Sequence, residues 1–190
     1  MPTIKITDAT VEPLTLAEAK AHLRVTLVDQ QNDDYITSLI AVARQAAEDR
    51  TQRTLLTTTW RLSLQAFPRG AVTLLKPRIQ SVQAIVYIDP AGQEQLLPAD
   101  AFVLDTASEA HQLAPTPGSA WPATRQQPGA VRITYVAGYA AAAEIPTPIV
   151  HWIKLALSDL YLNRTRSAER PALPQDFADG LLAVHEVQVL

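Results

Sequence analysis

The fold class is decided by residues 33–50, which read DDYITSLIAVARQAAEDR. Apolar side chains recur there at helical spacing, and the charged side chains fall largely on other faces. The two leading aspartates suit the positive end of a helix dipole. Adjacent acids such as Glu48 and Asp49 point in different directions on a helix, and we expect them on solvated faces. The stretch predicts one long amphipathic helix, whose apolar face is formed by Ile36, Leu39, Ile40, Ala43 and Ala47.

Helical patterns also occur on both sides of this stretch. Thr15 and Glu18 have the spacing of a capping box, which predicts a short helix that ends at about Leu23. Pro146 and Pro148 suit the first turn of a later helix, whose apolar face is formed by Ile149, Ile153, Ala156, Leu157, Leu160 and Tyr161. A last short helix is expected over residues 175–182. The N-terminal and C-terminal helices should pack together, since each offers one apolar face.

The prolines separate these helices from a middle region of a different kind. Ten of the 14 prolines lie between Pro68 and Pro148, and proline breaks helices and central strands. The middle region shows period-two alternation at Trp60, Leu62 and Leu64 and again over residues 82–88. A turn at residues 89–92 should lead into a hairpin partner over residues 93–97. Further short strands are expected at residues 102–105 and 131–136.

Trp121 lies in the most irregular part of this region, residues 115–129, which hold four prolines and two glycines. Such a segment can be disordered. A tryptophan followed by proline can instead pin an irregular loop onto the sheet. We favour the second interpretation, in which Trp121 is the anchor of the loop.

The sequence as a whole predicts an α+β fold, with a small α-helical bundle and an inserted antiparallel β unit. Four segments follow from the patterns: N-terminal helices of the bundle at residues 1–56, the β unit with its proline-rich loop at 57–140, the C-terminal helix of the bundle at 141–174, and a C-terminal docking tail at 175–190.

Composition and motif spacing exclude most catalytic chemistry. The 190 residues contain no cysteine, which excludes thiol catalysis, thiolate zinc sites and iron–sulfur clusters. Metal-ligand spacing is absent around His22, His111, His151 and His185, and the six glycines form no phosphate-binding loop. We therefore expect no enzyme, no metal and no cofactor.

A net charge of −3 argues against a free-standing nucleic-acid binder. No signal peptide or membrane span is visible, so a cytoplasm-like compartment is expected.

Two features near the C-terminus are candidates for binding a partner. A basic cluster can contact an acidic partner, or it can complement the dipole of the preceding helix. The apolar tail can engage a multivalent partner, or it can pack on the chain's own core. The cluster is Arg164, Arg166 and Arg170, and the apolar residues of the tail are Leu181, Leu182, Val184, Val187, Val189 and Leu190.

Over residues 11 to about 170 the sequence resembles the head–tail connector (adaptor) proteins of long-tailed bacteriophages, prophages and gene-transfer particles. Each motif is short, but their order and spacing are shared. The motifs begin with VEPLTLAEAKAHLR (11–24), AAE (46–48), TWRL (59–62), FP (67–68) and PRIQSV (77–82). They continue with SAWP (119–122), GAV (129–131), YVAGY (135–139) and YLNR (161–164). Beyond Pro171 the resemblance ends.

The resemblance implies a structural protein without catalysis, located in the virion neck after assembly in the host cytoplasm. Family members form a twelvefold ring beneath the portal protein, extend the DNA channel and carry a stopper or tail-completion protein. Genomic DNA would slide through the lumen without sequence-specific binding, and a free subunit could be monomeric. The tail and the basic cluster would dock onto the portal. The alternatives are a stopper or tail-terminator protein, and a small-ligand or enzymatic domain that uses the loop around Trp121.

Overall fold

The computed structural model describes residues 3–28, 30–106, 111–163 and 175–187 of the chain. They form two compact units. The β unit contains Met1–Ala9 and Thr57–Gly138, and the helical unit contains Thr10–Leu56 and Tyr139–Leu190. The expected α+β fold is confirmed, because the chain alternates between helices and antiparallel sheets.

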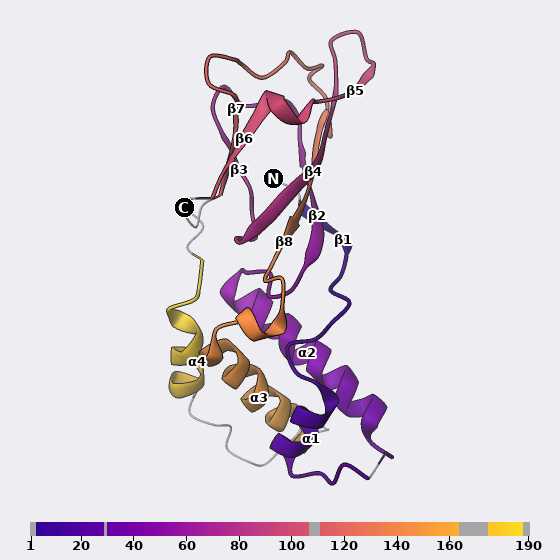
Figure 1. Cartoon of the computed structure of the whole chain (residues 1–190), viewed down its shortest axis with the longest axis vertical. Coiled ribbons are helices and arrows are strands. Elements are labelled where there is room, and N and C mark those ends of the chain that lie inside the picture. The colour runs from indigo at the N-terminus through magenta and orange to yellow at the C-terminus, as the bar shows by residue number, and fades with distance from the viewer. Residues whose placement is uncertain (1–2, 29, 107–110, 164–174, 188–190) are drawn as a thin grey trace. The chain divides into compact units, whose positions relative to one another are not determined.

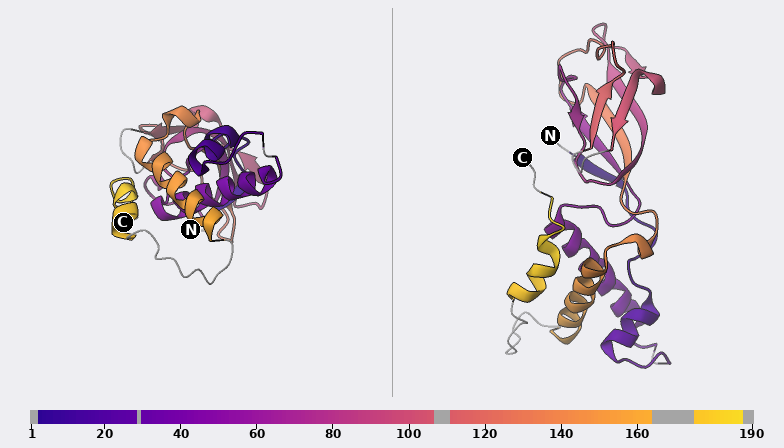
Figure 2. Two further views of the ribbon diagram at one scale, coloured as in Figure 1. Left: turned by 90° about the horizontal axis from the view of Figure 1, so that it is seen from below. Right: turned by 60° about the vertical axis from the view of Figure 1, so that its left-hand side comes forward.

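Four helices build the helical unit: α1 (Leu16–Leu23), α2 (Asp33–Thr51), α3 (Thr147–Leu162) and α4 (Gln175–Ala183). Helix α2 packs against the other three (Figure 1). Its apolar face is buried as the periodicity predicts, and it meets the buried face of α3. The right-hand view of Figure 2 shows α2, α3 and α4 side by side. No helix in the described part of the chain is both long and apolar enough to cross a membrane.

The capping box predicted at the start of α1 is present. The Thr15 hydroxyl accepts a hydrogen bond from the Glu18 amide, and the Glu18 carboxylate accepts one from the Thr15 amide at 2.8 Å. The hydrogen bonds from Thr15 lower the pKa of Glu18 below its ordinary value, so this carboxylate is ionised at neutral pH. Helix α1 ends at Leu23, and Arg24, which caps it, has a left-handed backbone conformation with φ 57°.

The β unit holds two antiparallel sheets. A five-stranded sheet has the order β1-β2-β8-β4-β5, and a three-stranded sheet has the order β3-β7-β6. The strands of the first are β1 (Thr3–Thr7), β2 (Thr58–Leu64), β4 (Ile79–Ile88), β5 (Glu94–Leu96) and β8 (Val131–Ala137). Those of the second are β3 (Val72–Thr73), β6 (Phe102–Asp105) and β7 (Gln112–Pro115).

The core of the β unit lies on one face of the larger sheet. Leu62, Ile133 and Ile85 stand opposite one another across β2, β8 and β4, and all three are fully buried. Leu113 of β7 adds to the same cluster. Tyr135 is also fully buried, and its hydroxyl donates to the Leu75 carbonyl at 2.8 Å. Burial raises the pKa of Tyr135 well above its ordinary value, so its hydroxyl remains a donor at neutral pH.

Strand β1 is a correction to the interpretation of residues 1–56 as helices of the bundle. Thr3–Thr7 pair with β2, so these residues belong to the sheet and not to the helical bundle. Ile4 and Ile6 are exposed, whereas Lys5 stands opposite Trp60 with its Nζ atom 5.7 Å from the ring centroid. Sequence analysis missed this strand because its apolar side chains face outward, so backbone pairing rather than apolar burial holds it.

Candidate functional site

The C-terminal residues that the sequence nominates for partner binding return to the helical unit. Helix α4 packs on α2 and α3, and Leu182 is fully buried. The Val187 amide donates to the Thr51 carbonyl at 3.0 Å, and Arg53 donates to the His185 carbonyl at 2.5 Å. Leu182 is therefore part of the chain's own core and is removed from the candidate docking residues, because a partner cannot reach a side chain without accessible surface.

Few of the nominated residues are accessible in the described part of the chain. Val184 follows α4 and is 86% exposed, whereas Leu181 and Val187 are half-buried. An ion pair between Arg50 and Glu186 at 2.9 Å holds this stretch against the end of α2. Five nominated residues lie outside the described residues: Arg164, Arg166, Arg170, Val189 and Leu190. Val184 is thus the described residue of the set that offers most of its side chain to a partner.

Trp121 lies against the segment that follows β2. Its ring stacks on Phe67 with centroids 4.7 Å apart and an interplanar angle of 4°. Its Nε1 atom donates to the Gly70 carbonyl at 2.8 Å. The indole therefore makes internal contacts through both its face and its N–H group, which is the arrangement expected of a loop anchor.

Replacing Trp121 with alanine should lower the free energy of unfolding of the β unit by about 1–3 kcal/mol, because the stacking and the hydrogen bond are both lost. Trp121→Phe keeps the stacking and should lose less. Chemical denaturation followed by tyrosine and tryptophan fluorescence measures both variants. Equal stability of Trp121→Ala and the wild type would show that the loop needs no anchor.

A network of buried charges joins three parts of the helical unit. Arg44 of α2 contacts Glu48 one turn later at 2.9 Å and Glu12, which precedes α1, at 2.8 Å. The second oxygen of Glu48 accepts the Leu55 amide at 2.8 Å. Arg44 and Glu48 are each only 4% exposed. The expectation that Glu48 lies on a solvated face is therefore wrong, because the segments around Glu12 and Leu55 cover this side of α2.

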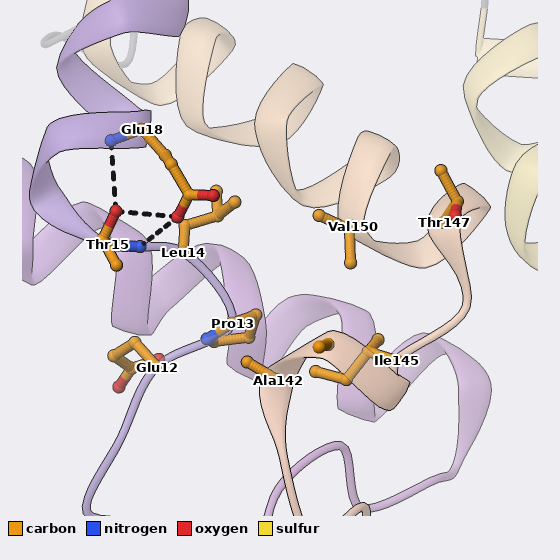
Figure 3. Close-up of a pocket in the computed structure, with 10 residues that line it drawn as sticks. Glu12, Pro13, Leu14, Thr15, Glu18, Ala142, Ile145, Thr147 and Val150 are labelled. Carbon is orange, nitrogen blue, oxygen red and sulfur yellow. Dashed lines mark hydrogen bonds between the residues drawn. The ribbon is translucent and has the colours of Figure 1, made fainter.

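A pocket of about 320 Å³ lies where the segment before α1 meets the start of α3 (Figure 3). Leu14, Ile145 and Val150 supply apolar walls, and Glu12 and Glu18 supply carboxylates. Both carboxylates are already held, Glu12 by Arg44 and Glu18 by Thr15. We call this the acidic pocket. Sequence analysis missed it because its two sides are more than a hundred residues apart and meet only through packing.

The four histidines have separate surroundings. His111 is buried, and its Nδ1 atom accepts the Ile79 amide at 3.3 Å. His22 of α1 is half-buried, and burial lowers the pKa of its imidazole below the ordinary value. A hydrogen bond with the Lys154 backbone opposes this shift, whereas the charges of Lys154 and His151 add to it. Among the residues that the structure describes, no three or more His, Asp or Glu side chains gather as metal ligands would.

The lowered pKa of His22 predicts a dependence of stability on pH. Below the ordinary imidazole pKa of about 6.5 the unfolded chain takes up a proton before the folded chain does. The free energy of unfolding should therefore fall as the pH decreases through that range. His22→Asn should show a shallower fall between about pH 7 and about pH 5. Urea denaturation at a series of pH values makes the comparison, and identical slopes for the two proteins would contradict the prediction.

Comparison with known proteins gives a consistent result. A family model described as phage gp6-like head–tail connector protein matches residues 13–88. No curated protein matches the sequence at a significant level. One similar chain comes from the neck of an empty gene transfer agent particle computed with C6 symmetry, at 25% identity and a TM-score of 0.81. A chain from the virion of a native gene transfer agent particle gives the same two values.

A third chain, from the neck of a native gene transfer agent particle computed with C12 symmetry, is 26% identical with a TM-score of 0.73. Each of the three similarities covers 100% of this chain and 98% of the other. The sequence match includes α1, α2, β2, β3 and β4, and the structural similarity extends to the whole chain. Residues 13–88 match the phage gp6-like head–tail connector family, and together with the similarity over the whole chain this match shows the role of a structural head–tail connector.

Proposed function

We propose that this chain is the head–tail adaptor in the neck of a tailed phage or a phage-like particle. It forms a ring beneath the portal, extends the DNA channel and links the capsid to the tail. The observation that carries the proposal is the similarity to a neck chain over 100% of this chain and 98% of the other, at a TM-score of 0.81. A gene transfer agent is the source that the structural similarities favour.

The proposed ring has twelve copies. The supporting observation is that the similar chains come from necks computed with C6 and with C12 symmetry. Twelve copies are compatible with both, since a twelvefold ring contains a sixfold axis. We propose that the free subunit is monomeric and that the portal acts as the template for the ring. Electron microscopy of the chain alone and of its complex with the portal protein tests this proposal.

We propose that the ring works through shape and contacts, without catalysis, cofactor or metal. Genomic DNA passes through the lumen without sequence-specific binding. The helical unit holds nine Lys and Arg against thirteen Asp and Glu, whereas the β unit holds seven against six. A surface with more acidic than basic side chains neutralises few DNA phosphates, and it therefore binds the passing DNA weakly.

The portal is the proposed partner on one side of the ring, and a stopper or tail-completion protein is the partner on the other. We propose that the stretch after α4 contributes to portal docking through Val184. The observation in support is that Val184 is 86% exposed beside a backbone held by the Arg50–Glu186 ion pair and the bond from Val187 to Thr51. Deleting residues 175–190 would also remove Leu182 from the core, so a point variant is the sharper test.

Val184→Asp should leave the fold unchanged and reduce capture by the portal protein about tenfold or more, since a carboxylate would be buried in the contact. Val42→Asp is the matched control, because Val42 is an exposed valine of the same unit on the outer side of α2. The measurement is a pull-down of purified full-length chains with the portal protein and, separately, with the tail-tube protein.

Normal capture of Val184→Asp by the portal would remove Val184 from the docking surface. Capture of the wild-type chain by the tail-tube protein alone would replace the adaptor function with that of a stopper or tail-terminator. Loss of capture by both Asp variants would point to a general effect of charge on the helical unit instead of a docking site.

A further inference from the structure

We infer that neighbouring copies in the ring join when the tip of the α1–α2 loop of one copy enters the acidic pocket of the next. The loop tip consists of Arg24, Leu27 and Val28, and the pocket lies between residues 12–18 and 142–150. The inference rests on the proposed ring and names the two surfaces that would close it.

Ring geometry requires two different surfaces on each copy. In a cyclic assembly every copy contacts the next head to tail, so one surface must be complementary to another on the same chain. The helical unit offers such a pair. The loop tip follows the C-terminal end of α1, and the pocket lies beside the N-terminal end of α1 and the start of α3.

The loop tip presents apolar side chains next to backbone that is hydrogen-bonded to Lys20. Val28 is 91% exposed and Leu27 is 63% exposed. The loop is held from inside by Lys20, which is 2% exposed, forms an ion pair with Asp33 and donates to the Leu27 carbonyl at 3.3 Å. The Val25 amide also donates to the Lys20 carbonyl at 3.0 Å. Backbone that is already held at Val25 and Leu27 before binding loses less conformational entropy when it is captured.

The pocket has the size and the lining to receive these side chains. Its volume of about 320 Å³ exceeds that of one aliphatic side chain, and Leu14, Ile145 and Val150 give it apolar walls (Figure 3). Leu14 and Ile145 are themselves buried, so the walls are fixed by packing against the helical unit. Insertion of Val28 or Leu27 would remove from water the apolar surface that the free subunit exposes.

The charges of the two surfaces are complementary. Glu18 stays ionised, Glu12 and Glu48 both pair with Arg44, and the exposed Glu144 lies beside the pocket. Lys154 of α3 offsets part of this negative charge. In the loop tip the guanidinium of Arg24 is exposed and makes no ion pair with any described residue. Opposite charges at the rim steer two surfaces together and fix their register.

Disulfide cross-linking tests this contact directly, because the natural chain contains no cysteine. The full-length double variant Val28→Cys with Ala142→Cys is assembled on the portal protein and oxidised. A disulfide forms only where the two Cα atoms approach to about 4.4–6.8 Å. We expect a ladder of covalent dimers, trimers and larger species on a non-reducing gel. Either single variant should remain monomeric, and so should the control pair Val28→Cys with Val42→Cys.

Four results would overturn the inference. An intact ring, seen by electron microscopy, without cross-links would leave the proposed function standing and exclude this contact. Dimers from Val28→Cys alone would show a two-fold pairing of loop tips instead. A product that contains the portal protein would make the portal the occupant of the pocket or the loop. Absence of any ring of the wild-type chain on the portal would refute the proposed function, and this contact with it.

Charge reversal gives an independent test. Arg24→Glu should weaken each junction about 1.5- to 5-fold, the range for an exposed ion pair, and the loss should diminish at high salt. Arg69→Glu is the matched control, since Arg69 is an exposed arginine of the β unit. The fraction of chain recovered in portal-bound rings is the measurement. An equal loss for both variants would show that net charge, and not the loop tip, governs assembly.

Discussion

Glu48→Ala is expected to destabilise the helical unit by about 3–5 kcal/mol, the cost of removing one partner of a buried ion pair. Glu48 is 4% exposed, and its two oxygens serve different groups, the Arg44 guanidinium and the Leu55 amide. Its removal takes the acceptor from the buried Leu55 amide and one carboxylate partner from the buried guanidinium of Arg44. An unsatisfied buried donor adds its own cost to that of the broken pair.

Asp49→Ala is the matched control for this prediction. Asp49 is the next residue on α2, is exposed, and accepts a hydrogen bond from Gln45, so its removal should change the free energy of unfolding by less than about 0.5 kcal/mol. Replacing both Arg44 and Glu48 with methionine should cost less than Glu48→Ala, because no guanidinium is left buried without Glu48, and Glu12, which loses Arg44, still has 26% of its side chain exposed to water. Urea denaturation gives the free energies, and a loss below that of Asp49→Ala would contradict the proposed role of the network.

Ile133→Ala is expected to destabilise the β unit by about 2–5 kcal/mol. Ile133 lies in the middle of β8, fully buried, between Leu62 of β2 and Ile85 of β4. The central strand of a five-stranded sheet is held on both sides, so its neighbours cannot move in to fill the cavity left by the missing atoms. A site that cannot collapse falls at the costly end of the range.

Graded substitutions separate a cavity effect from a general loss of order. Ile133→Val should cost about 0.5–1.5 kcal/mol, and Leu96→Ala on the exposed edge strand should cost less than about 0.5 kcal/mol. Hydrogen exchange should show faster opening of β2, β4 and β8 in Ile133→Ala. Faster exchange confined to α2 and α3 would contradict the assignment of Ile133 to the core of the β unit.

The parts of the fold that sequence analysis predicted are those with a strong local pattern. The stretch around Ile36 and Ile40 has helical periodicity and forms α2, and the pair Thr15 and Glu18 has cap spacing and begins α1. Alternation around Leu62 marks β2. In α2 and β2 the apolar residues that form the sequence pattern are also the residues that pack into the core, so the pattern predicts the packing correctly.

The parts that could not be predicted depend on residues distant in sequence. In the sequence Glu48 has the pattern of a surface residue, because the segments around Glu12 and Leu55 that cover it are distant along the chain. The apolar side chains of β1 are exposed, so this strand depends on backbone pairing with β2, which lies more than 50 residues away. The same holds for the candidate site. The composition of the tail indicates a binding surface, yet Leu182 is buried in the core of the helical unit. The acidic pocket has no local signature, because Leu14 and Val150 meet only in three dimensions.

The division of the chain has a mechanical consequence. In the described part of the chain the backbone passes between the two units three times, at residues 9–10, 56–57 and 138–139. A tensile force that separates the two units is therefore divided among three backbone connections, and each connection carries only part of that force. In a protein whose two units are joined by one linker, the whole force would act on that single backbone connection. For a structural connector, this threading gives tensile strength without added contact area.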